Sequence, residues 1–163
     1  MPNKILLAPI LQNARFDTEE RREGLNKLAQ LADLEMEPTE LTEDNADGVV
    51  GVIASSALIH PSFYQAAKKL RVVSRWGVGY ENTNYEIAAQ HGVFVTIAPE
   101  HMVTVAEYTI AQWMATLKRV YTLNHLSHGG DFSIIRTYEA SGSTLGLYGF
   151  GRIGQAVATR AKP

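Results

Sequence analysis

The strongest constraint on the fold is a series of strand-like apolar runs that alternate with segments of helical pattern. Lys4–Ile10 and Asp47–Ala54 are almost continuous in apolar residues, and Leu34–Met36, Leu70–Trp76 and Val93–Ile97 are further strand patterns. Runs of this kind are typical of parallel strands buried on both faces. Right-handed helical crossovers are then needed to connect the strands. We therefore expect a parallel sheet covered by helices.

Three segments between these runs predict the covering helices. Asp17–Ala32 has an apolar face opposite a charged cluster, with Asp17 or Thr18 as a plausible N-cap. Pro61–Lys69 begins with a proline, which the first turn of a helix tolerates, and Asn84–His91 is closed by Gly92. Residues 1–100 are therefore predicted to form one doubly wound α/β lobe of the flavodoxin-like kind.

A longer helix is predicted after this lobe, over Thr104–Tyr121. Thr104 and Glu107 have the spacing of a capping box, and the helix carries a broad apolar surface that includes Trp113, Met114 and Leu117. Such a surface should be buried against another domain or another subunit. The polar stretch Asn124–Gly142 is expected to be an irregular connecting arm, so that 101–142 form a separate segment.

Composition excludes several classes of function. The 163 residues are 45% hydrophobic and 20% charged, with a formal net charge of -2, which gives no electrostatic case for binding nucleic acid or an anionic membrane. There are no cysteines, so disulfides and thiolate metal sites are excluded. No apolar run approaches the roughly 20 residues of a membrane span. The opening residues also lack the pattern of a signal peptide, and we expect a cytoplasmic location.

The last part of the chain contains a glycine-rich motif of the form G-x-G-x-x-G. It follows a predicted strand, Thr144–Tyr148, and precedes a helical pattern, Gln155–Lys162. In this context Gly149 permits a tight turn, Gly151 lets a pyrophosphate approach the backbone, and Gly154 lets helix pack on strand. The alternative is a structural glycine turn.

The motif predicts that 143–163 open a Rossmann domain. The backbone N–H groups of its turn and the positive end of the following helix would face the phosphates. The candidate cofactor-binding residues are Gly149, Phe150, Gly151, Arg152, Ile153 and Gly154. The acidic residue that would hold the adenosine ribose is expected about 20 residues further on, so we expect the chain to be the front part of a longer enzyme.

Four segments in order carry a family resemblance. They are Arg75–Asn84, Gly92–Thr96, Val105–Glu107 and Leu145–Val157. Together they resemble the D-isomer-specific 2-hydroxyacid dehydrogenases, in particular the phosphoglycerate dehydrogenase-like branch. The resemblance implies a two-domain oxidoreductase that uses NAD to transfer hydride to or from C2 of a small 2-oxo or 2-hydroxy acid.

The resemblance also implies roles for individual residues. The loop at Gly77 would bind the substrate carboxylate through backbone N–H groups of Val78 and Gly79, the alternative being a plain strand-end turn. Arg75 resembles a basic residue that can approach a substrate phosphate or second carboxylate, and it is as readily a surface charge. Thr104 matches a position near the nicotinamide end of the cofactor, with helix capping as the alternative.

The same resemblance places the catalytic arginine, glutamate and histidine after the glycine-rich turn, so no catalytic residue is predicted in this chain. The segment Pro99–Val105 is about one residue shorter than the family pattern, and Glu81 replaces a more common aspartate. His125 and His128 would suit a metal only on a helix, and Gly129–Gly130 favours a loop, so no metal site is predicted.

Two interpretations of function remain open. The first is a dehydrogenase whose helix 104–121 forms a homodimer and which, in this chain alone, is inactive. The second is a non-catalytic module that uses the same fold for sensing NAD or for dimerisation. An intact arginine, glutamate and histidine set downstream would support the enzyme, and its loss would support the module.

Overall fold

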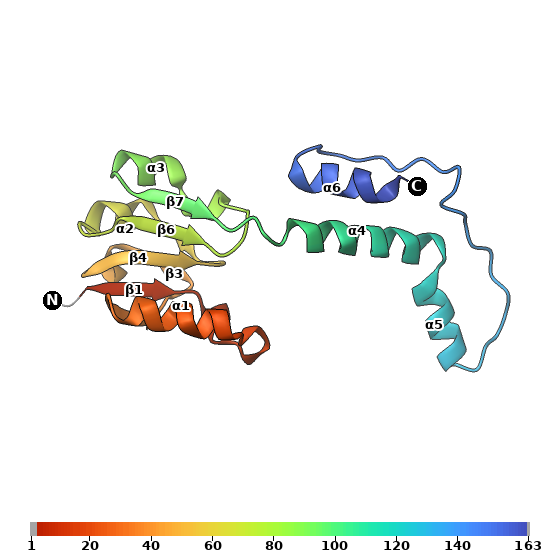
Figure 1. The fold of residues 1–163 in the computed structure, drawn as a ribbon, viewed down its shortest axis with the longest axis horizontal. Coiled ribbons are helices and arrows are strands. Elements are labelled where there is room, and N and C mark those ends of the chain that lie inside the picture. Colours follow the sequence, from red (N-terminus) through yellow and green to blue (C-terminus); the bar gives the residue numbers. More distant parts are fainter. Residues whose placement is uncertain (1–2, 163) are drawn as a thin grey trace. The chain divides into compact units, whose positions relative to one another are not determined.

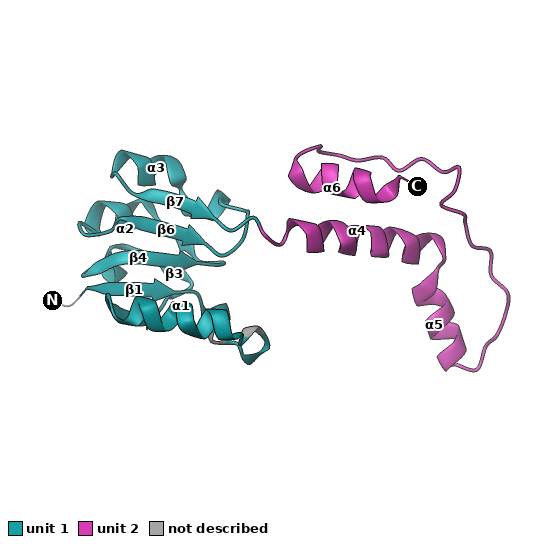
Figure 2. Cartoon of the chain, viewed as in Figure 1, with its two compact units in different colours: residues 1–99 teal, residues 100–163 magenta. Residues whose placement is uncertain are grey.

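The computed structural model describes residues 3–162 and divides the chain into two compact units, Met1–Pro99 and Glu100–Pro163 (Figure 2). Within the described residues, no helix is both long enough and apolar enough to cross a membrane.

The first unit is built on a five-stranded parallel sheet (Figure 1). Its strands are β1 (Lys4–Leu7), β2 (Asp33–Met36), β4 (Val49–Ala54), β6 (Val72–Arg75) and β7 (Phe94–Ile97). They lie in the order β2-β1-β4-β6-β7, with every neighbouring pair parallel. This is the doubly wound, flavodoxin-like order, and it confirms the predicted fold class.

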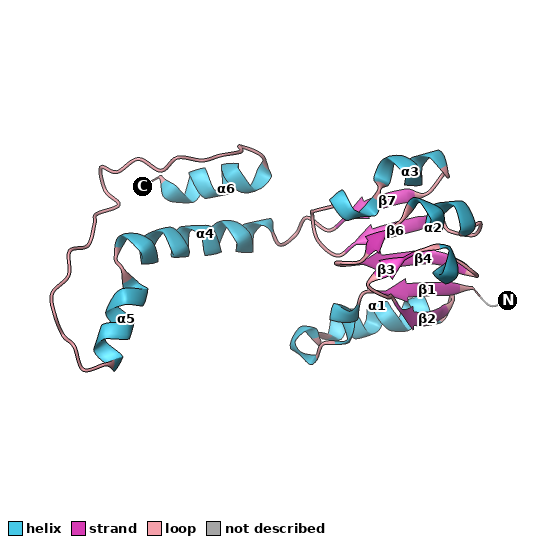
Figure 3. Ribbon diagram, turned by 180° about the vertical axis from the view of Figure 1, so that it is seen from behind, coloured by secondary structure: helices cyan, strands magenta, loops and turns pink. Residues whose placement is uncertain are grey.

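Helices cover both faces of this sheet (Figure 3). On one face, α1 (Glu19–Ala29) packs Leu25 and Leu28 against Ile5 and Leu7 of β1. Thr18 caps this helix by accepting a hydrogen bond from the Arg21 N–H at 3.2 Å, as predicted. On the other face, helices α2 (Pro61–Ala66) and α3 (Tyr85–Gln90) close a second core. Its fully buried residues include Val52, Phe63, Val73 and Ala88.

The five strand predictions of the first unit were correct in place, and four of them were too generous in length, whereas β2 begins one residue before the predicted Leu34–Met36. β1 ends at Leu7 because Pro9 begins a 3-10 helix, Pro9–Gln12, in place of further sheet. A small parallel pair, β3 (Glu40–Leu41) with β5 (Leu58–Ile59), was not predicted at all. Two residues are too few for a recognisable apolar alternation.

Over residues 100–162, the second unit contains three helices, α4 (Met102–Leu117), α5 (Val120–His128) and α6 (Arg152–Ala161). The predicted capping box is wrong, because α4 begins two residues before Thr104 and His101 is its N-cap. Thr104 is therefore inside the first turn, where its own backbone is helical. The single helix predicted to Tyr121 is also wrong, since Arg119 takes a left-handed conformation, with φ of 48°, and separates α4 from α5.

The polar segment after α4 is more helical than predicted. α5 continues to His128, where side chains bond back to the helix, as in the contact from Ser127 Oγ to the Leu123 carbonyl at 2.8 Å. His125 and His128 therefore do lie on a helix, and the loop predicted for them is wrong. No cluster of three possible metal ligands occurs among the residues described.

The predicted strand Thr144–Tyr148 does not form. A strand needs a neighbour for its N–H and C=O groups, and the described part of this unit has no strand to supply one. Helix α6 instead packs alongside α4 and buries Val157. Arg160 Nη2 lies 3.4 Å from a carboxylate oxygen of Glu107, which joins the two helices.

Candidate functional site

The candidate site of the first unit lies at the carboxyl edge of its sheet. In doubly wound folds ligands bind at this edge, near the point where the strand order reverses. Here the order reverses between β1 and β4. Two loops leave this edge from neighbouring strands, Ser55–Ala57 after β4 and Gly77–Gly79 after β6.

The loop Gly77–Gly79 presents free backbone donors. Gly77 has a φ of 137°, a conformation that side-chain-bearing residues rarely adopt, and its carbonyl accepts the Ala98 N–H at 2.9 Å. Neither the Val78 N–H nor the Gly79 N–H donates to an acceptor among the residues that the structure describes. Unpaired N–H groups at a glycine turn are suited to bind an anion.

Hydrogen bonds of Thr83 hold the short 3-10 helix Glu81–Thr83, which follows this loop. Thr83, which is fully buried, donates from Oγ1 to the Tyr80 carbonyl at 2.6 Å, and its own carbonyl accepts the buried Tyr64 hydroxyl. Burial raises the pKa of Tyr64, so the hydroxyl keeps the proton that it donates. This short helix is therefore fixed to helix α2.

Two asparagine amides tie the loop after β6 to the segment after β4. Asn82 Nδ2 donates to the Ala57 carbonyl at 2.6 Å, and Asn84 Nδ2 donates to the Ile59 carbonyl at 2.6 Å. Asn84 has a left-handed backbone, with φ of 47°, which asparagine tolerates better than most residues. Two hydrogen bonds thus join the chain that follows β6 to the chain that follows β4.

Two charged side chains hold the peptide group between Ala54 and Ser55. Arg75 Nη1 donates to the Ala54 carbonyl and to the Trp76 carbonyl, each at 3.2 Å. On the other side of the same peptide, the Ser55 N–H donates to Glu37 Oε1 at 3.1 Å. Glu37 is only 5% exposed, and burial raises the pKa of its carboxyl group, an effect opposed by the Ser55 N–H and by Arg75.

The three residues predicted to bind substrate differ in whether their hydrogen-bond donors are free. Val78 and Gly79 offer free N–H groups, whereas Arg75 uses Nη1 to hold backbone carbonyls at the ends of β4 and β6. Its Nε is buried without a partner among the described residues. Arg75 is therefore part of the scaffold that carries the loop.

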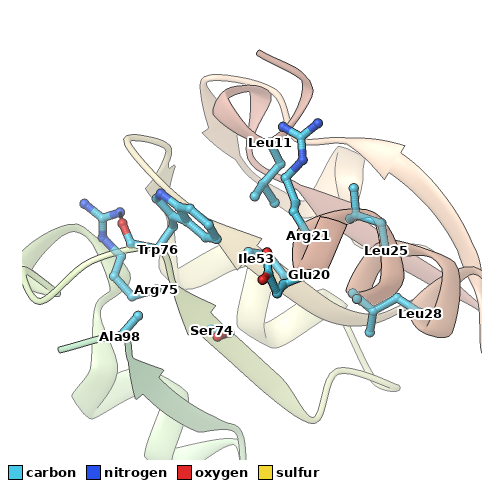
Figure 4. A pocket seen from close by; sticks show the side chains of 11 residues that line it. Leu11, Glu20, Arg21, Leu25, Leu28, Ile53, Ser74, Arg75, Trp76 and Ala98 are labelled. Atoms are coloured by element: carbon cyan, nitrogen blue, oxygen red, sulfur yellow. Dashed lines mark hydrogen bonds between the residues drawn. The ribbon is translucent and has the colours of Figure 1, made fainter. Parts of the chain in front are cut away.

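An apolar groove of about 500 Å³ lies between α1 and the sheet (Figure 4). Its lining includes Leu11, Leu25, Leu28, Ile53, Ser74 and Trp76, and the Arg75 guanidinium points away from Leu25 and Leu28. As the described residues form it, the lining does not include Val78 or Gly79. The groove is therefore separate from the free N–H groups.

The glycine-rich turn of the second unit precedes α6. Gly149 has a φ of 95°, and a Cβ at Gly154 would overlap the Gly149 carbonyl oxygen, so both positions need glycine for the turn itself. A Cβ at Gly151 would meet nothing within 4 Å. Gly151 therefore leaves one side of the turn open, where a ligand can approach the backbone.

The start of α6 supplies further donors. Its N-cap is Gly151, which has no side chain to bond the first turn, and the first helical bond that enters from the turn runs from Gln155 to the Gly151 carbonyl. Among the described residues, the N–H groups of Arg152 and Ile153 have no acceptor. A phosphate is the ligand that such a helix start favours.

Thr104, the other predicted cofactor-binding residue, lies on an exposed part of α4, in the first turn of that helix.

Comparison with known proteins establishes the family. The model of the D-isomer specific 2-hydroxyacid dehydrogenase catalytic domain matches residues 11–160. The chain therefore belongs to this family, and the sequence-based resemblance is confirmed.

Individual relatives agree with this assignment. A glyoxylate reductase of Thermococcus kodakarensis is 33% identical over 117 residues, which cover 66% of this chain and 35% of the relative. A D-3-phosphoglycerate dehydrogenase of Methanocaldococcus jannaschii is 35% identical over 126 residues, which cover 76% of this chain and 24% of the relative. The chain thus spans only about a quarter to a third of these two relatives.

A solved structure agrees in fold. It is the NADPH-dependent glyoxylate/hydroxypyruvate reductase of Sinorhizobium meliloti in complex with NADP and malonate. The TM-score is 0.73 at 25% identity, and the match covers 97% of this chain and 49% of that chain.

Sequence reasoning missed Glu37, Ser55, Asn82 and Asn84. Glu37 follows a weak strand and resembles any charged loop residue, and only the fold shows that its side chain turns inward. Asn82 and Asn84 lie within a motif that supported the family resemblance, but their acceptors are 25 residues away in the chain. A spacing of that length carries no recognisable pattern.

Replacing Tyr64 with phenylalanine tests the support of the loop. We expect Tyr64→Phe to lower the free energy of unfolding by about 1–3 kcal/mol, because the Thr83 carbonyl loses its donor inside the core. Chemical denaturation measures this. Tyr85→Phe is the control, since the Tyr85 hydroxyl bonds Glu86 at the surface. Equal effects of both substitutions would contradict the assignment.

Replacing Gly154 with alanine tests the packing of the turn. We expect Gly154→Ala to displace the start of α6 and to speed amide hydrogen exchange at Gln155 and the next turn, because a Cβ there overlaps the Gly149 carbonyl. Hydrogen exchange with mass spectrometry measures the change. Unchanged exchange in α6 would show that the turn does not require glycine at this position.

Proposed function

We propose that this chain provides the carboxylate-binding loop and the first pyrophosphate-binding turn of an NAD-dependent 2-hydroxyacid dehydrogenase. The observation that carries the proposal is the pair of free N–H groups at Val78 and Gly79, on a loop at the carboxyl edge of the sheet whose Gly77 is hydrogen-bonded to Arg75 and Ala98. Family membership supplies the class of reaction. The substrate is a small 2-oxo acid, or the matching 2-hydroxy acid.

The loop would bind the substrate through its carboxylate. Hydrogen bonds from N–H groups to an ionised carboxylate are stronger than bonds between neutral groups. Because Gly77 is already hydrogen-bonded, and Tyr64 and Asn82 hold the residues that follow the loop, little ordering entropy is lost on binding. The loop thereby sets the position of the neighbouring C2 carbon.

The glycine-rich turn fits a dinucleotide. Gly151 leaves room for the pyrophosphate, and Arg152 and Ile153 offer free N–H groups at the positive end of α6. A bound nicotinamide dinucleotide would supply or accept the hydride. We propose NAD(H), and comparison of NADH with NADPH in the same titration tests the choice.

We further propose that these 163 residues bind ligands without turning them over. In the family that the sequence resembles, the catalytic arginine, glutamate and histidine follow the glycine-rich turn, which here occupies Gly149–Gly154. The contribution of this chain is therefore binding and positioning, and not proton transfer.

A calorimetric titration with NADH tests the cofactor site. We expect saturable binding by the chain and about ten-fold weaker binding by Gly151→Ala, because a methyl group there meets the ligand and no protein atom. Glyoxylate with NADH should give no turnover above that of buffer. Equal affinity of the chain and the variant for NADH would refute cofactor binding by the glycine-rich turn. Steady turnover would refute the proposal that these 163 residues bind ligands without turning them over.

We also propose that α4 and α5 form a homodimer interface. Large apolar side chains are exposed on these helices, among them Val103 at 50%, Tyr108 at 64% and Tyr121 at 62%. Exposed apolar surface of this kind marks interaction sites. Light scattering should give the mass of a dimer, and Tyr108→Glu should reduce it to that of a monomer. A monomeric unsubstituted chain would contradict the proposal.

A further inference from the structure

Glu37 is a buried carboxylate at the point where the strand order of the sheet reverses. It directly follows β2, and its backbone N–H continues the ladder to β1 by donating to the Leu7 carbonyl at 2.9 Å. Its side chain turns inward, is 5% exposed, and leaves Oε2 buried without a partner among the described residues. A buried carboxylate with an unpaired oxygen lowers stability, so its presence calls for another explanation.

The contacts of Glu37 suggest that explanation. Glu37 accepts the N–H, and Arg75 binds the C=O, of one and the same peptide group, the one that joins Ala54 to Ser55. The two opposite charges therefore hold one peptide plane from both sides. The ends of β2, β4 and β6 meet in this arrangement.

The held peptide begins the loop that is tied to the candidate anion site. Beyond Ser55, the Ala57 carbonyl accepts the Asn82 amide at 2.6 Å, and Asn82 follows the Gly77–Gly79 loop. Arg75 itself immediately precedes that loop and also binds the Trp76 carbonyl at 3.2 Å. Glu37 is therefore linked, through the Ala54–Ser55 peptide and Arg75, to the residues on both sides of the Gly77–Gly79 loop.

We propose that Glu37 is a positioning residue of the carboxylate-binding edge: it fixes the Ala54–Ser55 peptide and balances the charge of Arg75 beside the Gly77–Gly79 loop. The inference rests on the proposed carboxylate-binding function of that loop. The balance has a direction, because removing the negative charge of Glu37 leaves the Arg75 charge uncompensated and strengthens the attraction for an anion. Removing the hydrogen-bond acceptor loosens the loop and acts in the opposite direction.

Two substitutions separate these effects. Glu37→Gln removes the charge and retains an oxygen that can accept the Ser55 N–H, whereas Glu37→Ala removes both. Glu35→Gln is the matched control, because Glu35 lies on β2, which directly precedes Glu37, and has an exposed side chain paired to Lys4 at 3.2 Å. Oxalate is the probe, and the amide NMR signals of Val78 and Gly79 report its binding.

The variants are expected to differ in their affinity for oxalate. Glu37→Gln should bind oxalate about three- to ten-fold more tightly than the unsubstituted chain, through the uncompensated charge. Glu37→Ala should bind about five-fold more weakly than Glu37→Gln, as the loss of one hydrogen bond would give. It should also show faster amide exchange at Ser55. Glu35→Gln should match the unsubstituted chain.

The contrary outcomes are distinct from one another. If all three variants bind oxalate as the unsubstituted chain does, and only the Ser55 exchange of Glu37→Ala changes, Glu37 is a structural residue and the inference is overturned. If oxalate shifts neither Val78 nor Gly79 in the unsubstituted chain, the proposed carboxylate site itself fails, and the inference fails with it.

Discussion

The hydrogen bonds between the loop after β4 and the loop after β6 determine the geometry of the candidate site. Parallel strands bring these loops to one edge, but they do not fix the orientation of individual N–H groups. That orientation comes from Asn82 on the Ala57 carbonyl, from Tyr64 on the Thr83 carbonyl, and from the charged pair on the Ala54–Ser55 peptide. These bonds are buried or half-buried, and breaking the Tyr64 bond, for example, leaves the Thr83 carbonyl without its donor inside the core.

The sequence predicted the fold well where the signal was local and repeated. The apolar runs located the five strands of the sheet, and the helices between them followed from Thr18, Pro61 and the apolar face of α1. The sequence failed where the deciding interaction was distant or subtle. Thr144–Tyr148 has a strand pattern but no neighbouring strand among the described residues, and the left-handed Arg119 interrupts a helix whose composition gives no warning.

The sequence predicted the glycines of the candidate site. It did not predict the side chains whose hydrogen bonds hold the surrounding backbone. Gly77 and Gly149 adopt backbone conformations that favour glycine, so the sequence records their role directly. Glu37, Asn82 and Asn84 bond backbone groups at least 18 residues away. A carboxylate or an amide in a loop does not indicate in the sequence which distant group it will bond. The setting of Arg75 likewise became visible only through its two carbonyl acceptors.

Carboxylate binding by the backbone of the Gly77–Gly79 loop is the proposal on which the function of this chain depends. A crystal structure of this chain grown with oxalate is the first experiment to perform. We expect a carboxylate group within hydrogen-bond distance of the Val78 and Gly79 nitrogens, with the Ala54–Ser55 peptide unmoved. An oxalate bound elsewhere, or a loop whose N–H groups are turned toward protein acceptors, would contradict it.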